Sequence, residues 1–319
     1  MAKKELTSCT SRQPESERIT PAQLAIKLCG EARVGLGCMG LTGIYGAVSP
    51  ESAADTLHAA LDAGIMLFDT AALYASGANE EMLGKVLGRR RDINVVTKFG
   101  LYEGANGALL RDSRPSTIRA SVEASLRRLR RDRLDLVLQH RPDPAVPDHI
   151  VAETVSALIK EGKVAAFGLS GKGTDRLQSW PLDPPIIAVQ NELSLATPHR
   201  QGEPSLVMAS GAVFMTYAPL GRGLLTGSRP GPHGDLRLEI PGFQKTGVGT
   251  LDGPMSVLKN LAERLGTPQS RIALAWLLAK CGNVIAIPGC RSRIQVEEIM
   301  AYCNILVSQA ELAKLDNAI

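Results

Sequence analysis

The sequence predicts an α/β fold, a single-domain (β/α)8 or TIM barrel, and three observations lead to it. From about Arg33 onward, short apolar runs alternate with stretches of helical spacing, a pattern typical of parallel strands joined by helices. Eight such runs can be counted, and eight strands close this barrel. Nothing between them resembles an inter-domain linker. An open, doubly wound sheet is the rival architecture.

The predicted strands are short and apolar throughout, as expected of strands that are buried on both faces. In chain order they are ARVGLG (32–37), IMLFD (65–69), INVVTK (93–98), LDLVLQH (134–140), VAAFGLS (164–170), IIAVQNE (186–192), VFMTYAP (213–219) and NVIAIPG (283–289). The intervening helices show apolar residues three or four positions apart, as in Ile118, Val122, Leu126 and Leu129, and in Val151, Val155 and Leu158. Ser49 and Pro50 supply an N-cap and a first helical residue.

Two regions break this alternation. Residues 1–20 are polar and rich in Ser, Thr and Glu, which predicts a mobile extension ahead of a barrel that spans residues 21–319. Residues 218–254 contain nine glycines and no sustained periodicity. Connections of that length inside a domain are usually lids or binding loops. Because this one follows the seventh strand, we expect it to cover the catalytic face of the barrel.

Composition and charge exclude several classes of protein. The chain has 319 residues, 44% hydrophobic and 21% charged, without a long apolar run that could span a membrane. Its basic start lacks the apolar core of a secretory signal. Six cysteines without paired spacing argue against disulfides and a metal site and favour the cytoplasm. The net charge of +4 is small, and the arginine runs 89–91 and 127–131 lack interleaved aromatics, so neither predicts a nucleic-acid partner.

The segment Gly35–Gly40 spells GxGxxG after a predicted strand. In a dinucleotide-binding fold this motif opens a helix at once. Here LTGIYGAVSP follows, and helical spacing begins only after Pro50. The motif is therefore better interpreted as the glycine-rich exit of the first strand.

Three predicted strands end in an ionisable side chain. One ends at Asp69, with Tyr74 a few residues later, the next ends at Lys98 and the third ends at His140. The carboxyl ends of barrel strands form the face where active sites lie, and consecutive strands place these ends side by side. We therefore expect the four side chains to meet at one rim. Taken singly, each has a structural interpretation, such as a solvated cap or a packing residue.

Together these side chains form a proton-transfer group. A phenol is a poor acid at neutral pH unless a neighbouring cation stabilises its anion. Lys98 supplies such a charge, and Asp69 can hold Lys98 charged and oriented. His140 can donate a hydrogen bond that steers a carbonyl oxygen toward Tyr74. These residue types therefore predict proton transfer to a carbonyl oxygen.

At this point a family resemblance becomes visible. In order along residues 33 to 303, the chain resembles the aldo-keto reductases in FDTAALY (68–74), Asn79-Glu80, VVTKFG, LDLVLQHRPDP, GLSG, AVQNE, MTYAPLGRGLLTG and IPGCRSR. The GLGCMG opening and Phe243-Gln244 resemble the long-chain bacterial and plant subgroup. The resemblance implies a barrel that moves a hydride between NADPH and a carbonyl compound, with Asp69, Tyr74, Lys98 and His140 as the catalytic tetrad and Tyr74 as the general acid.

The resemblance also implies where the cofactor lies. Tyr217 matches the aromatic that stacks on the nicotinamide ring, and Ser170 and Gln190 match residues that hydrogen-bond its carboxamide. Leu220, Gly221 and Leu225 match the segment that covers the pyrophosphate. Arg291 and Ser292 match the loop that binds the ribose 2′-phosphate, and Gln295 and Glu298 match the segment beside the adenine. Arg291 and Arg293 precede a predicted helix N-terminus, which also favours an anion. These two cations predict NADPH rather than NADH.

The chain departs from the family pattern at a few positions outside the tetrad. Gly171 stands where many relatives have a polar side chain, Ile299 replaces an Asn used against adenine, and Leu193 stands where long-chain relatives often have Tyr. The hairpin that usually closes the barrel floor is hard to recognise in residues 16–32. Gly171 therefore implies one carboxamide contact fewer than in many relatives, and Ile299 implies weaker contacts to the adenine.

The leading hypothesis is an NADPH-dependent reductase of aldehydes or ketones, without a metal. Tyr45, Tyr102 and Arg141 are candidates for the substrate wall. Two alternatives stay open. Lys98 could form a Schiff base, as in barrel aldolases, or the chain could be a cofactor-binding regulatory subunit of a membrane channel with little turnover.

Overall fold

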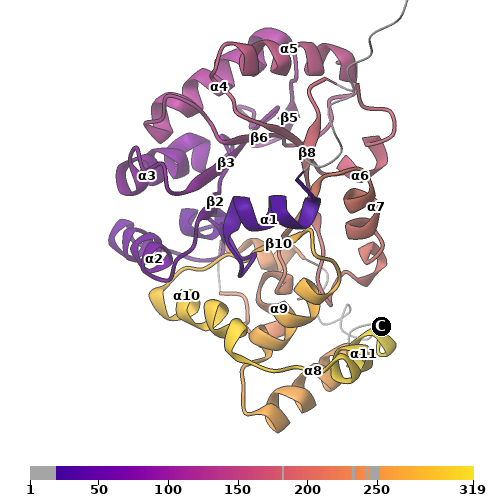
Figure 1. The fold of residues 1–319 in the computed structure, drawn as a ribbon. Helices are drawn as coiled ribbons and strands as arrows, with labels where there is room; N and C mark the ends of the chain where they lie inside the picture. The colour runs from indigo at the N-terminus through magenta and orange to yellow at the C-terminus, as the bar shows by residue number, and fades with distance from the viewer. Residues whose placement is uncertain (1–18, 182, 232–233, 241–242, 244–251) are drawn as a thin grey trace, which may run out of the picture.

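The computed structural model describes residues 19–181, 183–231, 234–240, 243 and 252–319. Its centre is an eight-stranded parallel sheet in the order β1-β2-β3-β6-β7-β8-β9-β10, surrounded by helices (Figure 1). Strand bounds are β1 Leu36–Gly37, β2 Leu67–Asp69, β3 Asn94–Phe99, β6 Leu136–Gln139, β7 Phe167–Ser170, β8 Ile186–Glu192, β9 Val213–Tyr217 and β10 Val284–Ile287. All eight predicted runs are therefore confirmed as strands.

The sheet closes on itself between its first and last strands. Parallel bridges join Val34 to Ala286 and Gly37 to Gly289. Gly37 is required there, because a Cβ on it would lie 2.7 Å from the carbonyl oxygen of Ile287. Each crossover returns the chain to a parallel neighbour, so all carboxyl ends lie at one face. The predicted barrel is confirmed, and the open sheet is excluded.

Helices form the outer layer of the barrel. The predicted apolar spacing is confirmed, because Ile118, Val122 and Leu129 are buried in one helix, and the predicted N-cap Ser49 accepts a hydrogen bond from the Ser52 amide. Helix bounds are α2 Pro50–Asp62, α3 Ala78–Leu87, α4 Pro115–Leu129, α5 Asp148–Lys160, α6 Gly173–Arg176, α7 Glu203–Ala209, α8 Asp252–Leu265, α9 Gln269–Ala279, α10 Arg293–Met300 and α11 Gln309–Asn317.

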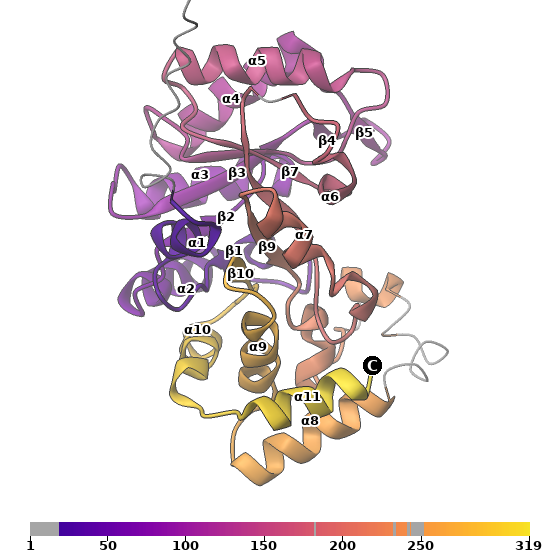
Figure 2. The ribbon, with the colours of Figure 1, turned by 45° about the vertical axis from the view of Figure 1, so that its right-hand side comes forward.

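A short helix, α1 (Pro21–Cys29), closes the floor of the barrel, in the region where the hairpin usual in the family was hard to recognise from the sequence. It lies across the amino-terminal ends of the strands in Figure 1 and is seen nearly end-on in Figure 2. A capping box starts it, in which Thr20 and Gln23 exchange hydrogen bonds. The Asn94 side chain at the start of β3 donates to the Leu28 carbonyl oxygen at 2.8 Å. The capping box thus stabilises the start of α1, and the Asn94 hydrogen bond ties the helix to the sheet.

Two apolar clusters hold the fold together. One fills the barrel and joins inward-facing side chains of the strands to Ala25 and Cys29 of α1. The larger one lies between the strands and the outer helices. The inner cluster fills the lower part of the barrel, so the polar groups at the carboxyl ends rest on a packed apolar layer.

The long connections contain structure that sequence spacing did not predict. After β3 the chain forms a small antiparallel hairpin, β4 (Leu101–Glu103) and β5 (Leu109–Arg111). Within residues 218–254, the described parts form two 3-10 helices, η5 (Gly221–Thr226) and η6 (Leu236–Glu239), and α8 begins at Asp252. Other 3-10 turns are η2 Met39–Thr42, η3 Tyr74–Gly77, η4 Pro198–Arg200 and η8 Ala301–Asn304. Residues 1–18 of the predicted extension lie outside the described residues.

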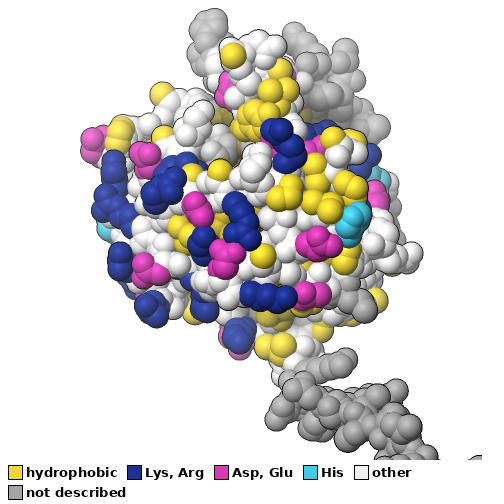
Figure 3. Space-filling view, turned by 90° about the horizontal axis from the view of Figure 1, so that it is seen from above, with side chains coloured by type: hydrophobic (Ala, Val, Ile, Leu, Met, Phe, Trp, Pro, Cys, Tyr) yellow, Lys and Arg dark blue, Asp and Glu magenta, His cyan; other side chains and the backbone are white. Residues whose placement is uncertain are grey.

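The basic runs are engaged in ion pairs. Arg128 pairs with Glu80 at 2.6 Å and Arg131 pairs with Asp135 at 2.7 Å. On the face shown in Figure 3, basic and acidic side chains are interspersed. Among the described helices, none is both long and apolar enough to cross a membrane.

Candidate active site

Three of the four predicted catalytic residues are in direct contact at the carboxyl ends of β2 and β3. Lys98 Nζ lies 2.6 Å from Asp69 Oδ1 and 3.4 Å from the hydroxyl oxygen of Tyr74. The same ammonium donates to the carbonyl oxygen of Thr70 at 2.8 Å. Asp69 and Lys98 are 3% and 1% exposed, so this ion pair is screened from water and rigidly placed.

The fourth residue, His140, follows β6. Its ring meets the Tyr74 ring edge-on, with 6.0 Å between centroids and an interplanar angle of 81°. Its backbone amide donates to the carbonyl oxygen of Phe99 at 2.9 Å, which ties the end of β6 to the end of β3. The predicted juxtaposition of all four side chains is therefore what the structure shows.

The second oxygen of Asp69 is also occupied. The Gln190 side chain, on β8, donates to Asp69 Oδ2 at 2.6 Å across the barrel mouth. The carboxylate thus accepts one hydrogen bond from Lys98 and one from Gln190. With both oxygens held, Asp69 fixes the position of the ammonium toward Tyr74.

Burial and charge set the protonation of this group. Burial opposes the charge on Lys98, but Asp69 and Tyr74 outweigh it and raise the pKa of the ammonium. Burial raises the pKa of the Tyr74 phenol, although Lys98 acts in the opposite direction. At neutral pH the lysine is therefore charged and the tyrosine carries its proton.

His140 is neutral for a similar reason. Burial, together with the positive charges of Lys98 and Arg141, lowers the pKa of His140 well below 6.5. A neutral imidazole carries one N–H. Its Nδ1 is buried and has no hydrogen-bond partner among the described residues. His140 can therefore offer a hydrogen bond to a ligand without carrying a charge.

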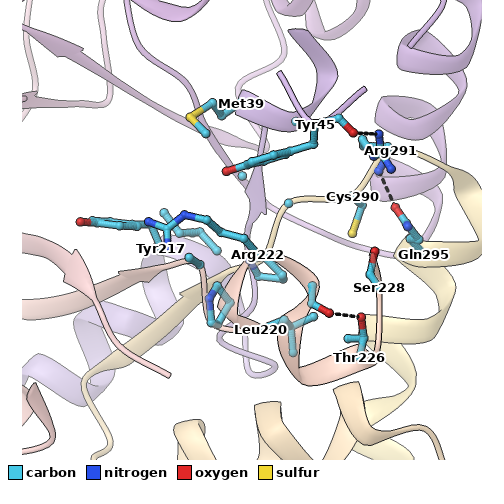
Figure 4. A pocket seen from close by; sticks show the side chains of 18 of the residues that line it. Met39, Tyr45, Tyr217, Leu220, Arg222, Thr226, Ser228, Cys290, Arg291 and Gln295 are labelled. Carbon is cyan, nitrogen blue, oxygen red and sulfur yellow. Dashed lines mark hydrogen bonds between the residues drawn. The ribbon is translucent and has the colours of Figure 1, made fainter. Parts of the chain in front are cut away.

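A cavity of about 1230 Å³ connects this group to the first turn of α10. Asp69, Tyr74 and His140 line this cavity, and so do Arg291 and Gln295. In Figure 4 the Tyr45 ring faces Tyr217 and Arg222 across the opening. One cavity is thus lined both by the proton-transfer groups and by the Arg291 guanidinium.

Comparison with known proteins identifies the family. The family model described as "Aldo/keto reductase family" matches residues 33–319. The chain belongs to the aldo/keto reductase family. It is 33% identical to aldo-keto reductase str7 of Strobilurus tenacellus, over 91% of this chain and 88% of that protein. It is 30% identical to the aldo-keto reductase yakc [NADP(+)] of Schizosaccharomyces pombe, over 89% of this chain and 87% of the relative.

Solved structures give the same family. A glycerol dehydrogenase from Gluconobacter oxydans superposes with a TM-score of 0.79 at 32% identity, over 90% of each chain. An aldo-keto reductase from Bacillus halodurans superposes with a TM-score of 0.73 at 26% identity, over 90% of this chain and 91% of the other. As an aldo/keto reductase, the chain is an oxidoreductase.

The structure brings most of the residues that family resemblance marked for the cofactor to the cavity. They come from the ends of β7, β8 and β9, from the start of the 218–254 segment and from around α10. Those that line the cavity are Ser170, Gln190, Tyr217, Leu220, Arg291, Gln295 and Glu298. Tyr45 and Arg141, expected in the substrate wall, line it as well.

Two predicted cofactor residues near η5 do not line the cavity. Gly221 and Leu225 are buried in η5, and Leu225 packs in the larger apolar cluster. Their neighbours Leu220, Arg222 and Gly223 line the cavity instead. The 3-10 turn points Leu220, Arg222 and Gly223 toward the cavity and Gly221 and Leu225 away from it. This turn was not predicted from the sequence.

Ser292 and Arg293 also lie outside the cavity. Ser292 caps α10 by accepting from the Gln295 amide and borders a separate hollow of about 300 Å³. Arg293 reaches across to α2, where its guanidinium pairs with Asp55 at 2.8 Å and Asp62 at 3.3 Å. Arg293 was expected to be a second cation for the cofactor, and the structure shows it used between helices. Its place in the first turn of α10 points it toward acidic residues of α2.

Tyr102 was expected in the substrate wall, and the structure places it elsewhere. It is 42% exposed, whereas Leu101 and Glu103 on either side line the cavity. Because successive side chains of a strand point to opposite faces, a tyrosine between two inward residues must face outward. The hairpin that sets this alternation was not predicted.

Sequence reasoning missed two arginines that shape the cavity. Arg222 pairs with Glu192 through two hydrogen bonds of 2.6 and 2.7 Å. Arg237 pairs with Asp235 at 2.6 Å and lies 5.7 Å from the Tyr45 ring centroid. An arginine between two glycines directly after a predicted strand was a signal for Arg222. No local pattern marked Arg237.

These arginines belong to a cover over the cavity. The amide of Leu236 donates to the carbonyl oxygen of Ile44 at 3.0 Å, and Tyr45 bridges to Asp235. Arg291 donates to the carbonyl oxygen of Tyr45 at 2.5 Å. The loop after β1, the η6 segment and the turn after β10 are thus joined above the cavity.

Proposed function

We propose that this enzyme reduces an aldehyde or ketone to an alcohol with NADPH, and that Tyr74 donates the proton. The proposal rests chiefly on the contact between a buried Lys98–Asp69 ion pair and the Tyr74 hydroxyl in the wall of a large cavity. The choice of cofactor is supported by a relative, the aldo-keto reductase yakc [NADP(+)] of Schizosaccharomyces pombe, whose name includes NADP(+). When bound, the reduced nicotinamide supplies the hydride that is added to the carbonyl carbon.

The residues of this chain handle the proton. The Tyr74 hydroxyl gives its proton to the carbonyl oxygen, and the Lys98 ammonium stabilises the phenolate that is left. Asp69 keeps Lys98 charged and in place. The neutral His140 ring donates a hydrogen bond to the carbonyl oxygen and orients it toward Tyr74. In the oxidising direction the same steps run in reverse.

The cavity wall fits a dinucleotide of this kind. The cavity joins the tetrad to Arg291, whose guanidinium donates to the backbone carbonyl oxygens of Tyr45 and Gly46 and, among the described residues, to no carboxylate, so its charge is available to a 2′-phosphate. Along the wall, Thr267 Oγ1 and Gln269 Oε1 are buried without a partner among the described residues. Tyr217 offers a face for the nicotinamide, and Ser170 and Gln190 offer hydrogen bonds to its carboxamide.

The Schiff-base alternative is disfavoured by Lys98 itself. A nucleophilic lysine needs a lowered pKa so that it is neutral when it attacks. Here Asp69 and Tyr74 raise the pKa of Lys98 against the effect of burial. Its three donors also have partners in Asp69, Thr70 and Tyr74. This lysine is therefore suited to electrostatic support and not to attack.

The variant Tyr74→Phe tests the proposal. It removes the donated proton and keeps the ring, so we expect kcat to fall by roughly 100-fold to 10,000-fold with NADPH affinity unchanged. Turnover is followed by loss of NADPH absorbance over a panel of aldehydes and ketones, and affinity by fluorescence titration. Retained carbonyl reduction would refute the role of Tyr74.

Tyr302→Phe is the matched control, because the Tyr302 hydroxyl donates to the Ala32 carbonyl oxygen and does not line the cavity. Its kcat should equal that of the wild type. A wild-type enzyme that binds NADPH but reduces no carbonyl in the panel would support the regulatory-subunit alternative instead.

The cytoplasmic location of the protein stays a prediction. Among the described cysteines, Cys29, Cys38, Cys281, Cys290 and Cys303 are free thiols, as is usual in the reducing cytoplasm.

A further inference from the structure

We propose that Arg141 makes this enzyme selective for carbonyl substrates that carry an anionic group, such as a carboxylate. The inference rests on the proposed reductase function and concerns the same cavity. It assigns Arg141 as a specificity-determining residue that contacts the substrate.

The position of Arg141 is fixed by an unusual glycine. Gly171, at the end of β7, has a φ of +55°, and a Cβ on it would lie 2.7 Å from both Cδ and an Nη of Arg141. Any other residue at 171 would have to displace the guanidinium. The glycine therefore leaves room for the Arg141 side chain, which follows His140 directly and lines the cavity together with Tyr74 and His140.

The guanidinium of Arg141 is hydrogen-bonded but not neutralised. One Nη donates to the carbonyl oxygen of His140 at 2.7 Å and to Ser170 Oγ at 3.4 Å. Among the described residues, no carboxylate lies within ion-pair distance of it, and Nε and the other Nη have no hydrogen bond. The nearby Asp143 carboxylate accepts from the amides of Ser113 and Ala145. Two parallel donors and a full charge thus remain for a ligand.

The other cations around the catalytic end are each paired with a carboxylate. Lys98 pairs with Asp69, and the two cover arginines pair with Glu192 and Asp235. His140 is neutral. Glu103 also lines the cavity, but it is exposed on the hairpin and has no ion pair within the described chain. Among the described cations that line the cavity near Tyr74, Arg141 is therefore the one without a carboxylate partner.

An uncompensated guanidinium in a partly enclosed cavity favours an anion strongly. Such a group binds a carboxylate through two parallel hydrogen bonds, which are stronger than neutral ones. Because Arg141 adjoins His140, a bound carboxylate would place a carbonyl a few bonds away near His140 and Tyr74. The charge would thus be used to bind and orient the substrate, while proton transfer stays with Tyr74.

A matched pair of aldehydes tests this directly, namely 4-oxobutanoate and its methyl ester. They share chain length and carbonyl, and differ in charge. With the wild type, we expect kcat/KM to be about 10-fold to 100-fold higher for the acid, the range of a charge-assisted hydrogen bond. Arg141→Met should bring this acid-to-ester ratio close to one, chiefly by raising KM for the acid. Arg141→Lys should restore part of the preference.

Two results would overturn the proposal. One is a wild-type enzyme with equal kcat/KM for the ester and the acid. That result would leave the proposed reductase function intact. The other is an Arg141→Met variant that loses NADPH affinity and both aldehydes to the same extent, which would place Arg141 beside the nicotinamide carboxamide through Ser170.

A binding experiment keeps the proposal testable without turnover. Butanoate titrated calorimetrically into the NADP-loaded enzyme should bind, and butanamide should bind at least about tenfold more weakly. The Arg141→Met variant should not distinguish the two. Equal binding of butanoate and butanamide by the wild type would contradict the proposal even if no aldehyde were reduced.

Discussion

Lys98 is a buried ammonium balanced by one carboxylate, so the single variants of this pair should be far more harmful to stability than the double variant. Removing one partner of a buried pair leaves the other charge without compensation, which costs about 3–5 kcal/mol. Removing both replaces the pair by neutral groups. In the proposed mechanism, the ion pair is therefore a requirement of the chemistry more than a source of net stability.

We expect Asp69→Asn to lower the free energy of unfolding by about 3 kcal/mol, and Asp69→Asn/Lys98→Met to recover much of that loss without recovering activity. Chemical denaturation and carbonyl turnover measure the two effects. A double variant no more stable than Asp69→Asn would show that the cost does not come from the unpaired ammonium.

The neutral His140 makes stability depend on pH. Burial and two neighbouring cations hold its pKa well below 6.5 in the folded state, whereas the unfolded chain takes up the proton at about 6.5. Because the unfolded state then binds more protons, the stability contribution is present above that pH and is lost as pH falls below it.

The free energy of unfolding should therefore decline as pH falls from about 7 to about 5, and His140→Gln should reduce that decline. Urea denaturation across this range, with the exposed His149→Gln as a control, gives the comparison. Identical slopes for wild type and His140→Gln would mean that His140 is protonated in the folded enzyme.

Among the elements, α3 and α4 pack unusually closely at Gly84. A Cβ at this position would lie 2.1 Å from the carbonyl oxygen of Arg128, at the end of α4. The approach lets Arg128 reach the buried Glu80, which also accepts from Thr97 on β3 at 2.5 Å. One glycine thus holds two helices near the strand that carries Lys98.

Gly84→Ala should lower the free energy of unfolding by about 1–3 kcal/mol, the usual cost of overpacking, although alanine favours helices elsewhere. Gly202→Ala is the control, because Gly202 has nothing within 4 Å of an added Cβ and a helical φ of −76°. Thermal and urea unfolding report both. Equal stability of the two variants would contradict this account of the helix contact.

The cover over the cavity depends on Arg237, which is buried and holds Asp235, Ser228 Oγ and the carbonyl oxygen of Arg229. We expect Arg237→Met to release η6 from the loop at Ile44, so that the Leu236 amide exchanges with deuterium faster by at least roughly tenfold. The exposed Arg229→Met is the control. Unchanged exchange in Arg237→Met would show that backbone contacts alone hold the cover.

At the scale of the whole molecule, the eight strands and their order followed from apolar runs that local periodicity makes visible. The tetrad followed too, because each strand ends in a recognisable group. The floor helix, the hairpin and the two cover turns did not, since each is stabilised by contacts with residues far away in the chain. Arg293 and Tyr102 show most clearly what the sequence does not predict. Their positions next to predicted strands placed them near the cavity, but did not show the direction in which their side chains point.

Since the cavity touches the barrel, the cover, α9 and α10, a bound cofactor should stabilise the whole fold. NADPH at 100 times its Kd should add about 2.7 kcal/mol and raise the Tm by several degrees. NADH should raise the Tm less than NADPH does, and Arg291→Met should reduce the difference between the two Tm shifts. Differential scanning fluorimetry measures this. Equal shifts for both cofactors in the wild type would contradict the role of Arg291 in recognising the 2′-phosphate.

The pairing of β2, β3 and β6 sets the geometry of the tetrad, with Asp69 opposite Val96 and Lys98 opposite Leu138. A slip of one residue in β3 would turn Lys98 out of the barrel. Catalysis therefore reports on folding. After refolding from denaturant, specific activity would therefore measure the fraction of molecules in which every strand is paired in the correct register. Circular dichroism cannot distinguish these molecules from misfolded ones with near-native secondary structure.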